Sequence, residues 1–412
     1  MHRALPALLL LVFAASAPAQ VIVGDEILSD PLRPRLAPAL PLAVPAVSLA
    51  KDRSGIAIAW TMANSSGADR VYVARLDDNG HVAGSVHEMP PATAAAQTHE
   101  VYPSIDAAPD GNGFVAAWLE IDPYAPMTAR AVFARLDAAL MPLAPAVLFP
   151  APLTTTPAIV RTSNAKTWIS AGGFVWTMDA DGALNGPFGG LLFASDMTIA
   201  GGVPHLAGSH AVKSDSYTCQ PGCVVVGGPF RGFCPDQCHI YHTDTEIDFS
   251  APPAVTVAKT FKFVSDAQPA LAGNGSDVVV VWFRGAQADG GDVVFTRMPP
   301  SSSTGLDAGT PLTSFPGDTG PTRPDIAVDG ARYVVTWRVR TSAGNHDVAG
   351  AVIDADDRLT PLTIATTAAD ERDPAILALG GGTFLVAYET ISGTERRIAG
   401  RFITFGRRRA TR

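Results

Sequence analysis

Short apolar runs, separated by turns rich in glycine, asparagine and aspartate, follow one another along most of the chain. The stretch from 265 to 295 shows the unit clearly. A proline opens a short apolar run, Asn274-Gly275 makes a turn, and a β-branched run ends at Trp282. Runs of this kind are typical of strands buried on both faces. No segment keeps a sustained apolar period of about 3.6 residues, so the pattern predicts an all-β fold with very little helix.

The unit recurs seven times. A proline opens the first strand of each copy, at intervals of 47 to 65 residues: Pro45, Pro103, Pro157, Pro204, Pro269, Pro324 and Pro374. In five copies an aromatic residue ends the second strand 13 to 15 residues later: Trp60, Trp118, Trp282, Trp337 and Tyr388. In the copies that begin at Pro157 and Pro204, Trp168 and Val226 take this place. Such a repeat predicts an array of similar units rather than two or three unrelated domains.

Each copy contains four predicted strands. In the copy at Pro324 they are 325–328, 333–337, 347–353 and 359–365. Four-stranded units of about 40–60 residues are typical of β-propeller blades, and a propeller has roughly four to eight of them. We therefore predict one seven-bladed β-propeller domain over residues 20–404, with blades that begin near residues 45, 103, 157, 204, 269, 324 and 374.

The two ends of the array complement each other. The last copy has only three predicted strands, which end at 404, and a basic tail follows at 405–412. The first copy is preceded by a surplus apolar segment at 33–43, similar to the fourth strand of the second copy at 143–148. We predict that 33–43 is an N-terminal strand that completes the last blade and closes the ring, because closure removes exposed strand edges. An open β-solenoid or several β-sandwiches would explain neither the extra segment before the first copy nor the missing fourth strand of the last copy.

The rhythm P-x-[IV]-A … VVVW … D-x-x-G, most regular outside the third and fourth copies, resembles that of the secreted bacterial β-propeller repeat proteins. The resemblance covers roughly residues 45–404. It implies the propeller fold and export from the cell. Because proteins of this kind have many functions, the resemblance implies no particular chemistry.

The beginning of the chain has the features of a signal peptide. Met1-His2-Arg3 is positively charged, residues 4–14 are apolar, and Ala17-Pro18-Ala19 fits a cleavage site between small residues. We predict that residues 1–19 are removed and that the mature protein is secreted or periplasmic. No later run approaches the roughly 18 apolar residues of a membrane-spanning helix.

The charge of the chain limits its partners. The sequence contains 30 Lys and Arg against 39 Asp and Glu, a net charge of −9, and loss of Arg3 with the leader makes the charge one unit more negative. Nucleic acids and anionic membranes are poor partners for such a protein, since phosphate binding needs a basic surface. We expect a monomer that binds a carbohydrate or a protein.

The repeat also distinguishes two faces. Connections between blades share one face with the loops between second and third strands, which are long and polar at 61–70, 120–130, 284–292, 338–347 and 389–397. We call this the long-loop face. Because function concentrates on loops held by a rigid scaffold, we expect a ligand there, around the central channel. The candidate ligand-binding residues are Glu120, Asp122, Tyr124, Arg284, Arg338, Arg340, Glu371, Arg372, Asp373 and Glu389.

Three functions fit this picture, although solvated loop charges are the simplest explanation of the candidates. The first is a binding or interaction module. The second is a propeller enzyme acting on polysaccharide, a glycoside hydrolase or lyase, because paired carboxylates can serve as acid and base and arginines can hold an anionic sugar. The third is a structural surface protein. No catalytic residue is assigned, since the chain has no nucleophile elbow, His-Glu-x-x-His motif or glycine-rich phosphate loop.

The three functions predict different channel mouths. An enzyme predicts charged side chains with strongly shifted pKa values that converge there. A binding module predicts an aromatic or polar shelf, and a structural protein predicts a mouth filled by side chains. The tryptophans end apolar strands, so we expect them to pack between blades rather than to bind sugars.

Acidic turns at 77–80, 179–182 and 354–357 suggest calcium, which takes six to eight oxygen ligands. Each turn is shorter than a full calcium-binding loop, and Asp, Asn and Gly suit turns for backbone reasons alone. We therefore predict plain turns, no metal site and no cofactor.

All four cysteines fall in the fourth copy: Cys219, Cys223, Cys234 and Cys238. In an exported chain they predict two disulfides. A nested pairing (219 with 238, 223 with 234) and a local pairing (219 with 223, 234 with 238) are both open, and the expected strand register favours the local one. A zinc site built from the four thiolates, or one that adds His239 and His242, is the alternative, which an oxidising compartment disfavours.

Overall fold

The computed structural model describes most of the chain between residues 21 and 406. The described ranges are 21–28, 47–63, 68–92, 98–122, 125–143, 147–149, 158–163, 166–172, 174–189, 194–213, 224–226, 231–233, 243–250, 258–259, 269–286, 290–300, 309–316, 324–341, 344–393 and 395–406. Every regular element in them is a strand, so the all-β part of the prediction is confirmed. These ranges contain no helix with the length and apolarity that crossing a membrane requires.

Seven antiparallel sheets of four or five strands follow one another along the described chain, and we number them I to VII. Sheet I contains β3 (Val47–Asp52), β4 (Gly55–Ala63), β5 (Asp69–Leu76) and β6 (Val82–Glu88). Sheet II contains β7 (His99–Ala107), β8 (Phe114–Asp122), β9 (Ala125–Leu136) and β10 (Val147–Phe149). Sheet III contains β11 (Ile159–Thr162), β12 (Lys166–Ala171), β13 (Phe174–Asp179) and β14 (Leu184–Gly189). Sheet IV contains β15 (Ala194–Ala200), β16 (Val203–Lys213), β19 (Thr243–Ser250) and β20 (Ala258–Lys259).

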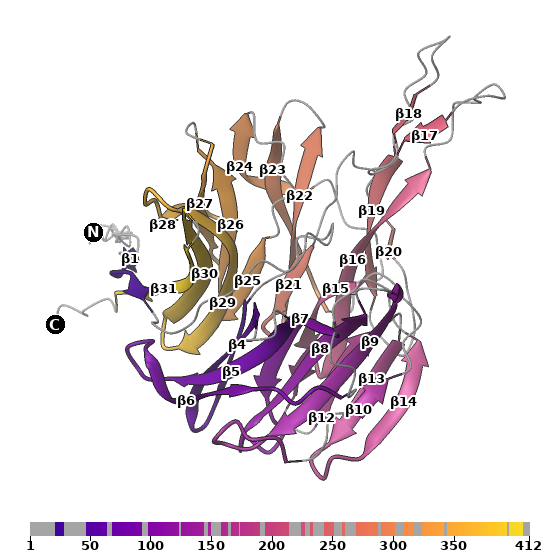
Figure 1. Ribbon diagram of the computed structural model, residues 1–412. Coiled ribbons are helices and arrows are strands. Elements are labelled where there is room, and N and C mark those ends of the chain that lie inside the picture. Colours follow the sequence, from indigo (N-terminus) through magenta and orange to yellow (C-terminus); the bar gives the residue numbers. More distant parts are fainter. Residues whose placement is uncertain are drawn as a thin grey trace, which may run out of the picture.

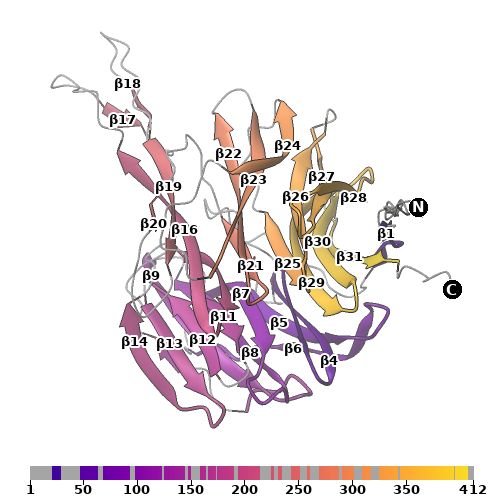
Figure 2. The same ribbon diagram turned by 180° about the vertical axis from the view of Figure 1, so that it is seen from behind.

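The remaining sheets follow the same plan. Sheet V contains β21 (Ala270–Gly273), β22 (Val278–Ala286), β23 (Gly290–Met298) and β24 (Thr310–Pro316). Sheet VI contains β25 (Asp325–Asp329), β26 (Arg332–Arg340), β27 (His346–Ile353) and β28 (Leu359–Ala365). Sheet VII contains β29 (Asp370–Gly380), β30 (Thr383–Ser392) and β31 (Glu395–Phe405), and both β1 (Val21–Val23) and β2 (Ile27–Leu28) pair with β31. A separate hairpin of β17 (Val224–Val226) and β18 (Arg231–Phe233) lies between β16 and β19 in the chain, and Figures 1 and 2 show it beyond the ends of these two strands.

The first strands of the seven sheets lie next to one another. β3 contacts β7, β7 contacts β11, β11 contacts β15, β15 contacts β21, β21 contacts β25, and β25 contacts β29. β29 in turn contacts β3. The sheets therefore extend outward from a common centre, as the views from the two sides show (Figures 1 and 2).

The repeated aromatic residues pack between neighbouring sheets. Each is fully or almost fully buried and shares an apolar cluster with the preceding sheet: Trp118 with sheet I, Trp282 with sheet IV, Trp337 with sheet V, Tyr388 with sheet VI, and Trp60 with sheet VII. Trp118, for example, lies in one cluster with Ala57, Ala59 and Val71. Small and β-branched residues on the facing sheet leave room for the large ring. The prediction that the tryptophans pack between blades is confirmed.

The fourth copy differs from the prediction. Pro204 lies in β16, the second strand of sheet IV, and the first strand is β15. Val226 lies in the separate hairpin and not in sheet IV. A proline before an apolar run marks the beginning of a strand but does not say which strand of a sheet it is. The long insertion between β16 and β19 removed the regular spacing that identified the other copies.

The structure also corrects the predicted pairing partner of β31. The predicted closing segment, residues 33–43, lies outside the described residues. Within them, Val21 pairs with Phe405 and Val23 with Ile403, so residues 21–28 take the place that we predicted for 33–43. Val21-Ile22-Val23 is β-branched and can donate every backbone hydrogen bond. The segment 33–43 contains Pro34, Pro38 and Pro41, and proline cannot donate to a strand ladder.

Tyr388 stands where other copies have tryptophan, and its hydroxyl explains the difference. The ring is buried in sheet VII, and its hydroxyl donates a hydrogen bond to Glu26 Oε2 at 2.8 Å. Arg401 donates to the carbonyl of Gly24 at 3.1 Å and lies 3.7 Å from Glu26. A tryptophan at position 388 has no hydroxyl for this bond. These contacts fasten the segment between β1 and β2 to the core of the sheet.

Replacing Tyr388 with Phe is expected to lower the free energy of unfolding by about 2 kcal/mol, because a buried hydrogen bond to a charged group is lost. Urea denaturation followed by circular dichroism measures this change. In a double-mutant cycle, Y388F and E26A together are expected to cost clearly less than their sum. Tyr333→Phe is the control, because the Tyr333 hydroxyl donates to the carbonyl of Asp277 instead. Additive losses for Y388F and E26A would contradict the contact.

Candidate functional site

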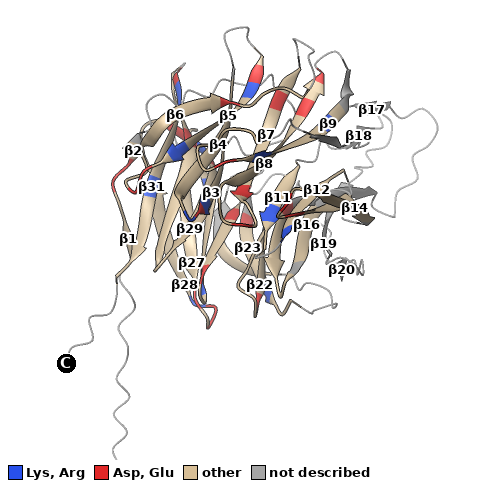
Figure 3. Cartoon of the chain, turned by 90° about the horizontal axis from the view of Figure 1, so that it is seen from below, with Lys and Arg blue, Asp and Glu red and all other residues tan. Residues whose placement is uncertain are grey.

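A cavity of about 270 Å³ lies where the first strands meet. Residues from β3, β7, β11, β15, β21, β25 and β29 line it, together with Ala158 directly before β11. We call it the axial cavity. Figure 3 shows acidic and basic positions on strands in the middle of the molecule as well as in loops at its edge. The cavity is therefore the place where residues from all seven sheets come together.

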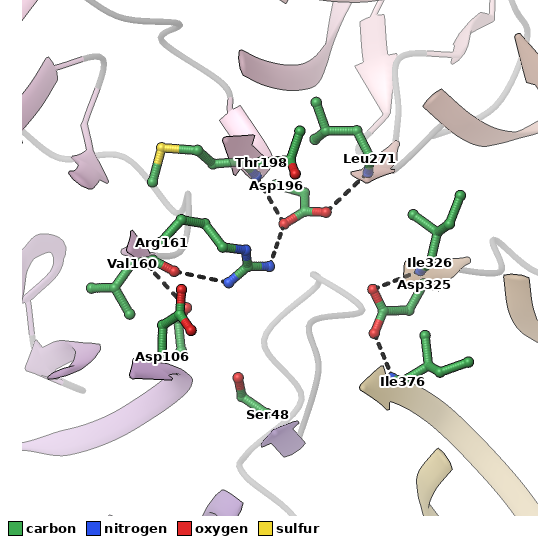
Figure 4. Close-up of polar contacts among 12 residues, drawn as sticks. Ser48, Asp106, Val160, Arg161, Asp196, Thr198, Leu271, Asp325, Ile326 and Ile376 are labelled. Carbon is green, nitrogen blue, oxygen red and sulfur yellow. Dashed lines mark hydrogen bonds and ion pairs between the residues drawn. The ribbon is translucent and has the colours of Figure 1, made fainter. Parts of the chain in front are cut away.

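The lining combines apolar side chains with a set of polar ones. Four are charged: Asp106, Arg161, Asp196 and Asp325. Ser48, Ser104 and Thr198 add hydroxyl groups. Figure 4 shows Ser48, Asp106, Arg161, Asp196, Thr198 and Asp325, which come from β3, β7, β11, β15 and β25, around the same space. Alternate residues of a strand point to the same side, so pairs such as Ser104 with Asp106 and Asp196 with Thr198 both reach the neighbouring strand.

The three aspartates hold neighbouring sheets together in the same way. One carboxylate oxygen accepts the N–H of the following residue, and the other accepts an N–H from the first strand of the next sheet. Asp106 accepts from Ala107 at 2.8 Å and Thr162 at 2.7 Å, Asp196 from Met197 at 2.8 Å and Leu271 at 3.0 Å, and Asp325 from Ile326 at 2.9 Å and Ile376 at 2.8 Å. These bonds satisfy strand N–H groups that face a cavity instead of a ladder partner.

The hydroxyl groups of the lining also accept a backbone N–H from the first strand of the next sheet. Ser48 Oγ accepts the N–H of Ile105 at 3.1 Å, and Thr198 Oγ1 accepts that of Gly273 at 3.1 Å. Ser104 Oγ accepts the N–H of Val160 at 3.2 Å. Each hydroxyl keeps its own hydrogen as a donor. The polar lining is thus held rigidly by the backbone.

Among the described residues that line the cavity, Arg161 is the one cation. Its guanidinium donates to Asp196 Oδ1 at 2.8 Å and to the carbonyl of Val160 at 2.8 Å. Burial opposes its charge, but attraction to Asp196, Asp106 and Asp325 is stronger and raises the pKa of Arg161. Burial raises the pKa of Asp106 and outweighs both Arg161 and the two N–H donors. Burial thus disfavours the ionised form of Asp106 despite the neighbouring guanidinium.

A second group of acidic residues lies buried at the beginning of β7 and the end of β8. Glu100 is 0% exposed, accepts the N–H of Val71 at 3.0 Å, and has Arg70 Nε 4.0 Å from its other oxygen. Glu120 lies opposite Glu100 in the strand register and accepts the N–H of Ala92 at 2.6 Å. Burial raises the pKa of Glu100 to about 7.

Sheet VII repeats this arrangement. Glu371, like Glu100, lies three residues before the repeat proline and is 0% exposed, and it accepts the N–H of Thr367 at 3.1 Å. Burial raises the pKa of Glu371 and that of Glu389, the latter to about 7 although Arg396 donates to Glu389 at 2.8 Å. A register shift follows both glutamates, and the residue before each proline has a positive φ, 63° at Tyr102 and 48° at Asp373. The bulge turns each glutamate into the space between two sheets.

The residues predicted from sequence do not form one site. Arg372 and Glu389 are register partners, and Arg372 and Asp373 both act on the Glu389 carboxyl electrostatically. Arg372 also donates to Asp370, which accepts from His346 Nδ1 at 2.8 Å. The other predicted residues lie elsewhere. Arg284 pairs with Asp292 at 3.0 Å, and Glu371 is buried beside Thr367. Arg338 and Arg340 lie on β26, Glu120 and Asp122 lie on β8, and Tyr124 is outside the described residues. None of the described candidates is among the residues that line the axial cavity.

The polar lining of the cavity was not predicted from the sequence. Its charged residues lie within first strands, whereas we expected functional residues in loops. These residues are Asp106, Arg161, Asp196 and Asp325. The available signal was a polar residue at alternate positions of an otherwise apolar first strand, as in Ser104-Ile105-Asp106.

The acidic turns use their carboxylates as turn residues do. Asp77 Oδ1 accepts the N–H groups of Asn79 and His81 at 2.9 and 2.8 Å, and Asp354 Oδ1 accepts those of Asp356 and Arg358 at 2.9 Å. Among the described residues, no three acidic, histidine or cysteine side chains are placed to hold a metal ion. The predicted disulfide residues Cys219, Cys223, Cys234 and Cys238 lie outside the described residues.

No protein-family model and no curated protein sequence matches the chain. A solved structure of a protein of unknown function from Dyadobacter fermentans DSM 18053 is similar, with a TM-score of 0.52 and 12% identity over 95% of this chain and 100% of that one. At this identity the likeness shows the fold alone. Radial sheets of four antiparallel strands whose first strands meet at the centre define the class. The chain has a β-propeller-type fold.

Two further solved propeller-like matches are more distant. The β-propeller domain of the Trilobed protease from Pyrococcus furiosus, described as having an open velcro topology, has a TM-score of 0.43 and 11% identity over 87% of this chain and 95% of that one. Trypanosoma rangeli sialidase in complex with sialic acid has a TM-score of 0.44 and 9% identity over 87% of this chain and 53% of that one. Likenesses at these scores carry no argument about the chemistry of this chain.

Proposed function

We propose that the chain is an exported, monomeric binding module, built as a closed seven-bladed propeller, whose carbohydrate or protein ligand binds at the axial cavity from the long-loop face. The observation that carries the proposal is the cavity itself, an open space with rigidly held polar groups from several sheets. Concave sites in which a few polar groups converge among apolar side chains are typical ligand sites.

Closure of the ring is supported by contacts between the first and last sheets. β29 contacts β3, and Trp60 of sheet I shares a buried cluster with Leu385 and Ala387 of sheet VII. Residues 21–28 supply the outer strand of the last blade in this proposal. Export is supported by the signal-peptide features of residues 1–19 and by the resemblance to secreted propeller repeat proteins.

The arrangement favours binding over catalysis. Each carboxylate of the cavity accepts backbone N–H groups on both of its oxygens, which suits a structural or binding role. Glu100 and Glu389, whose pKa values lie near 7, could serve as acid or base but are not part of the cavity lining. A purely structural protein would have a centre filled by side chains, and the volume of the cavity argues against that alternative.

The test is a binding screen on the mature chain, residues 20–412. The melting temperature is measured with a panel of oligosaccharides and with candidate protein partners. A ligand at 100 times its Kd adds about 2.7 kcal/mol to the free energy of unfolding, which shifts the transition visibly. Arg161→Met is expected to abolish the shift, and Arg284→Met, on the surface pair with Asp292, is expected to keep it. A shift that R161M leaves unchanged, or conversion of the ligand to product, would contradict the proposal.

A further inference from the structure

Sheets II and VII begin with segments that repeat one arrangement. We call residues 98–102 and 369–373 the entry segments. Each contains one member of a histidine–aspartate pair four residues before the repeat proline and a buried glutamate three residues before it. The glutamates are Glu100 and Glu371, and a register shift follows each of them. The same groups therefore lie at two junctions between neighbouring sheets, I with II and VI with VII.

The entry segment of sheet II is fastened to the beginning of β5 in sheet I. His99 Nδ1 lies 2.8 Å from Asp69 Oδ2. Glu100 Oε2 accepts the N–H of Val71 at 3.0 Å. Two adjacent residues of the segment thus contact the first residues of the third strand of the preceding sheet.

The entry segment of sheet VII is fastened to the beginning of β27 in sheet VI, with histidine and aspartate exchanged. Asp370 Oδ1 accepts the N–H of His346 at 3.0 Å and lies 2.8 Å from His346 Nδ1. Asn345 donates to the carbonyl of Ala369 at 2.9 Å. At both junctions, polar contacts at the end of one strand, rather than a complete strand ladder, join the segment to the preceding sheet.

Each glutamate buries a carboxylate oxygen without a donor. Among the described residues, none donates to Glu100 Oε1 or to Glu371 Oε2, and both atoms are buried. Arg70 Nε lies 4.0 Å from Glu100 Oε1, which is too far for a hydrogen bond. Burying a charge on an oxygen that lacks a partner is costly, whereas a protonated carboxyl buries no charge. Both entry segments are therefore most stable in their packed position while the glutamates carry a proton.

The groups that face the two glutamates support this preference. They are, for Glu100, Arg70 and Tyr72 of β5, Glu88 of β6 and Glu120 of β8, and, for Glu371, Asp347 of β27 and Glu26. Burial is the largest cause that raises the pKa of both carboxyls, and the facing carboxylates raise it further. The pKa of Glu100 rises from 4.5 to about 7, so its contribution to stability is complete below pH 4.5 and is lost as the pH rises through about 7.

We propose that the two entry segments form a pH-sensitive latch, in which each segment stays packed against the preceding sheet while its glutamate is protonated and opens locally when the glutamate ionises. Tyr102 and Pro103, at the end of one segment, and Pro374, directly after the other, line the axial cavity. Opening of the latch therefore changes the lining of the cavity, whichever ligand binds there.

The experiment is hydrogen exchange of the mature chain, read by mass spectrometry from about pH 5.5 to about pH 8.5 and corrected for the intrinsic exchange rate of each peptide. Labelling times of seconds to minutes report local opening rather than global unfolding. Protection of the peptides that cover 98–102 and 369–373 is expected to fall at least about tenfold over this range, because each glutamate becomes ionised. The central residues of β8 and β30 are expected to keep their protection.

Two crossed variants assign the opening to its glutamate. Glutamine keeps an acceptor oxygen and stays neutral at every pH. Glu100→Gln is expected to keep segment 98–102 protected at high pH while segment 369–373 still opens. Glu371→Gln is expected to show the converse, so each variant is the matched control of the other. If a variant does not fold, the comparison of the entry segments with β8 and β30 in the parent chain decides.

Three results would overturn the latch. One is equal protection of both segments at all pH values, and another is a parallel loss in the centres of β8 and β30, which would show global opening. The third is opening of a segment in its own glutamine variant, because another group would then be responsible. These measurements contain no ligand, so the binding screen tests the proposed function separately.

Discussion

Replacing Trp118 with alanine is expected to lower the free energy of unfolding by about 3–5 kcal/mol, as large-to-small changes of buried aromatic residues do. Trp118 is 0% exposed and fills the space between sheets I and II, where Ala57 and Ala59 cannot expand to fill a cavity. The loss therefore includes the transfer of the ring to water and the cavity that remains. Urea denaturation followed by circular dichroism measures it.

Trp118→Phe is the matched control. It keeps an aromatic ring between the sheets and removes an indole N–H that is buried without a hydrogen-bond acceptor. A buried donor without a partner is costly, so its removal offsets part of the lost packing. We expect W118F to cost less than about 2 kcal/mol. Equal losses for W118A and W118F would show that the ring does not fill the space between the sheets.

Raising the pH from about 4.5 to above 7 is expected to destabilise the fold through Glu100. Burial raises the pKa of Glu100 from its ordinary value of 4.5 to about 7. The folded state thus binds this proton more tightly than the unfolded state, so the stabilisation is complete below pH 4.5 and is lost as the pH rises through 7. One pKa unit corresponds to about 1.4 kcal/mol, so the loss is about 3 kcal/mol.

Glu100→Gln isolates this contribution, because glutamine is neutral at every pH and its amide oxygen can still accept the Val71 N–H. The difference in unfolding free energy between E100Q and the parent chain, measured by urea denaturation from pH 4 to 8.5, cancels the other titrating groups. We expect little difference at pH 4 and up to about 3 kcal/mol in favour of E100Q above pH 7. Glu395→Gln, in an exposed pair with Arg397, is the control and should show no such trend. A difference for E100Q that does not change with pH would refute the buried-acid explanation.

Much of the local structure was predictable. In the sixth copy the predicted strands 325–328, 333–337, 347–353 and 359–365 lie within or close to β25, β26, β27 and β28. The prediction works because apolar and β-branched runs between turn residues specify strands through local chain properties. The prediction for the fourth copy was wrong for the same reason. The local pattern at Pro204 indicates a strand, but it does not indicate that this strand is the second of its sheet.

The candidate site was predictable only as a region. The sequence predicted a ligand on the long-loop face around a central channel, which stays a prediction. The predicted residues were loop charges such as Arg284 and Arg338, which are not among the residues that line the axial cavity. Asp106 and Asp325 are far apart in sequence and each looks like an isolated polar residue in an apolar strand. Glu100 and Glu371 share a position in the repeat, but their burial depends on the neighbouring sheet.

The sequence by itself determined the strands, the turns and the repeating four-stranded unit, because these depend on side-chain alternation and turn chemistry within a few residues. Only the tertiary structure decided which segment pairs with β31, how the fourth sheet is composed, and which polar side chains share the axial cavity. These features depend on contacts between segments that are far apart in the chain, such as Arg161 with Asp196 and Val21 with Phe405. The energies of such contacts depend on burial and on neighbouring charges, which exist only after the sheets have packed together.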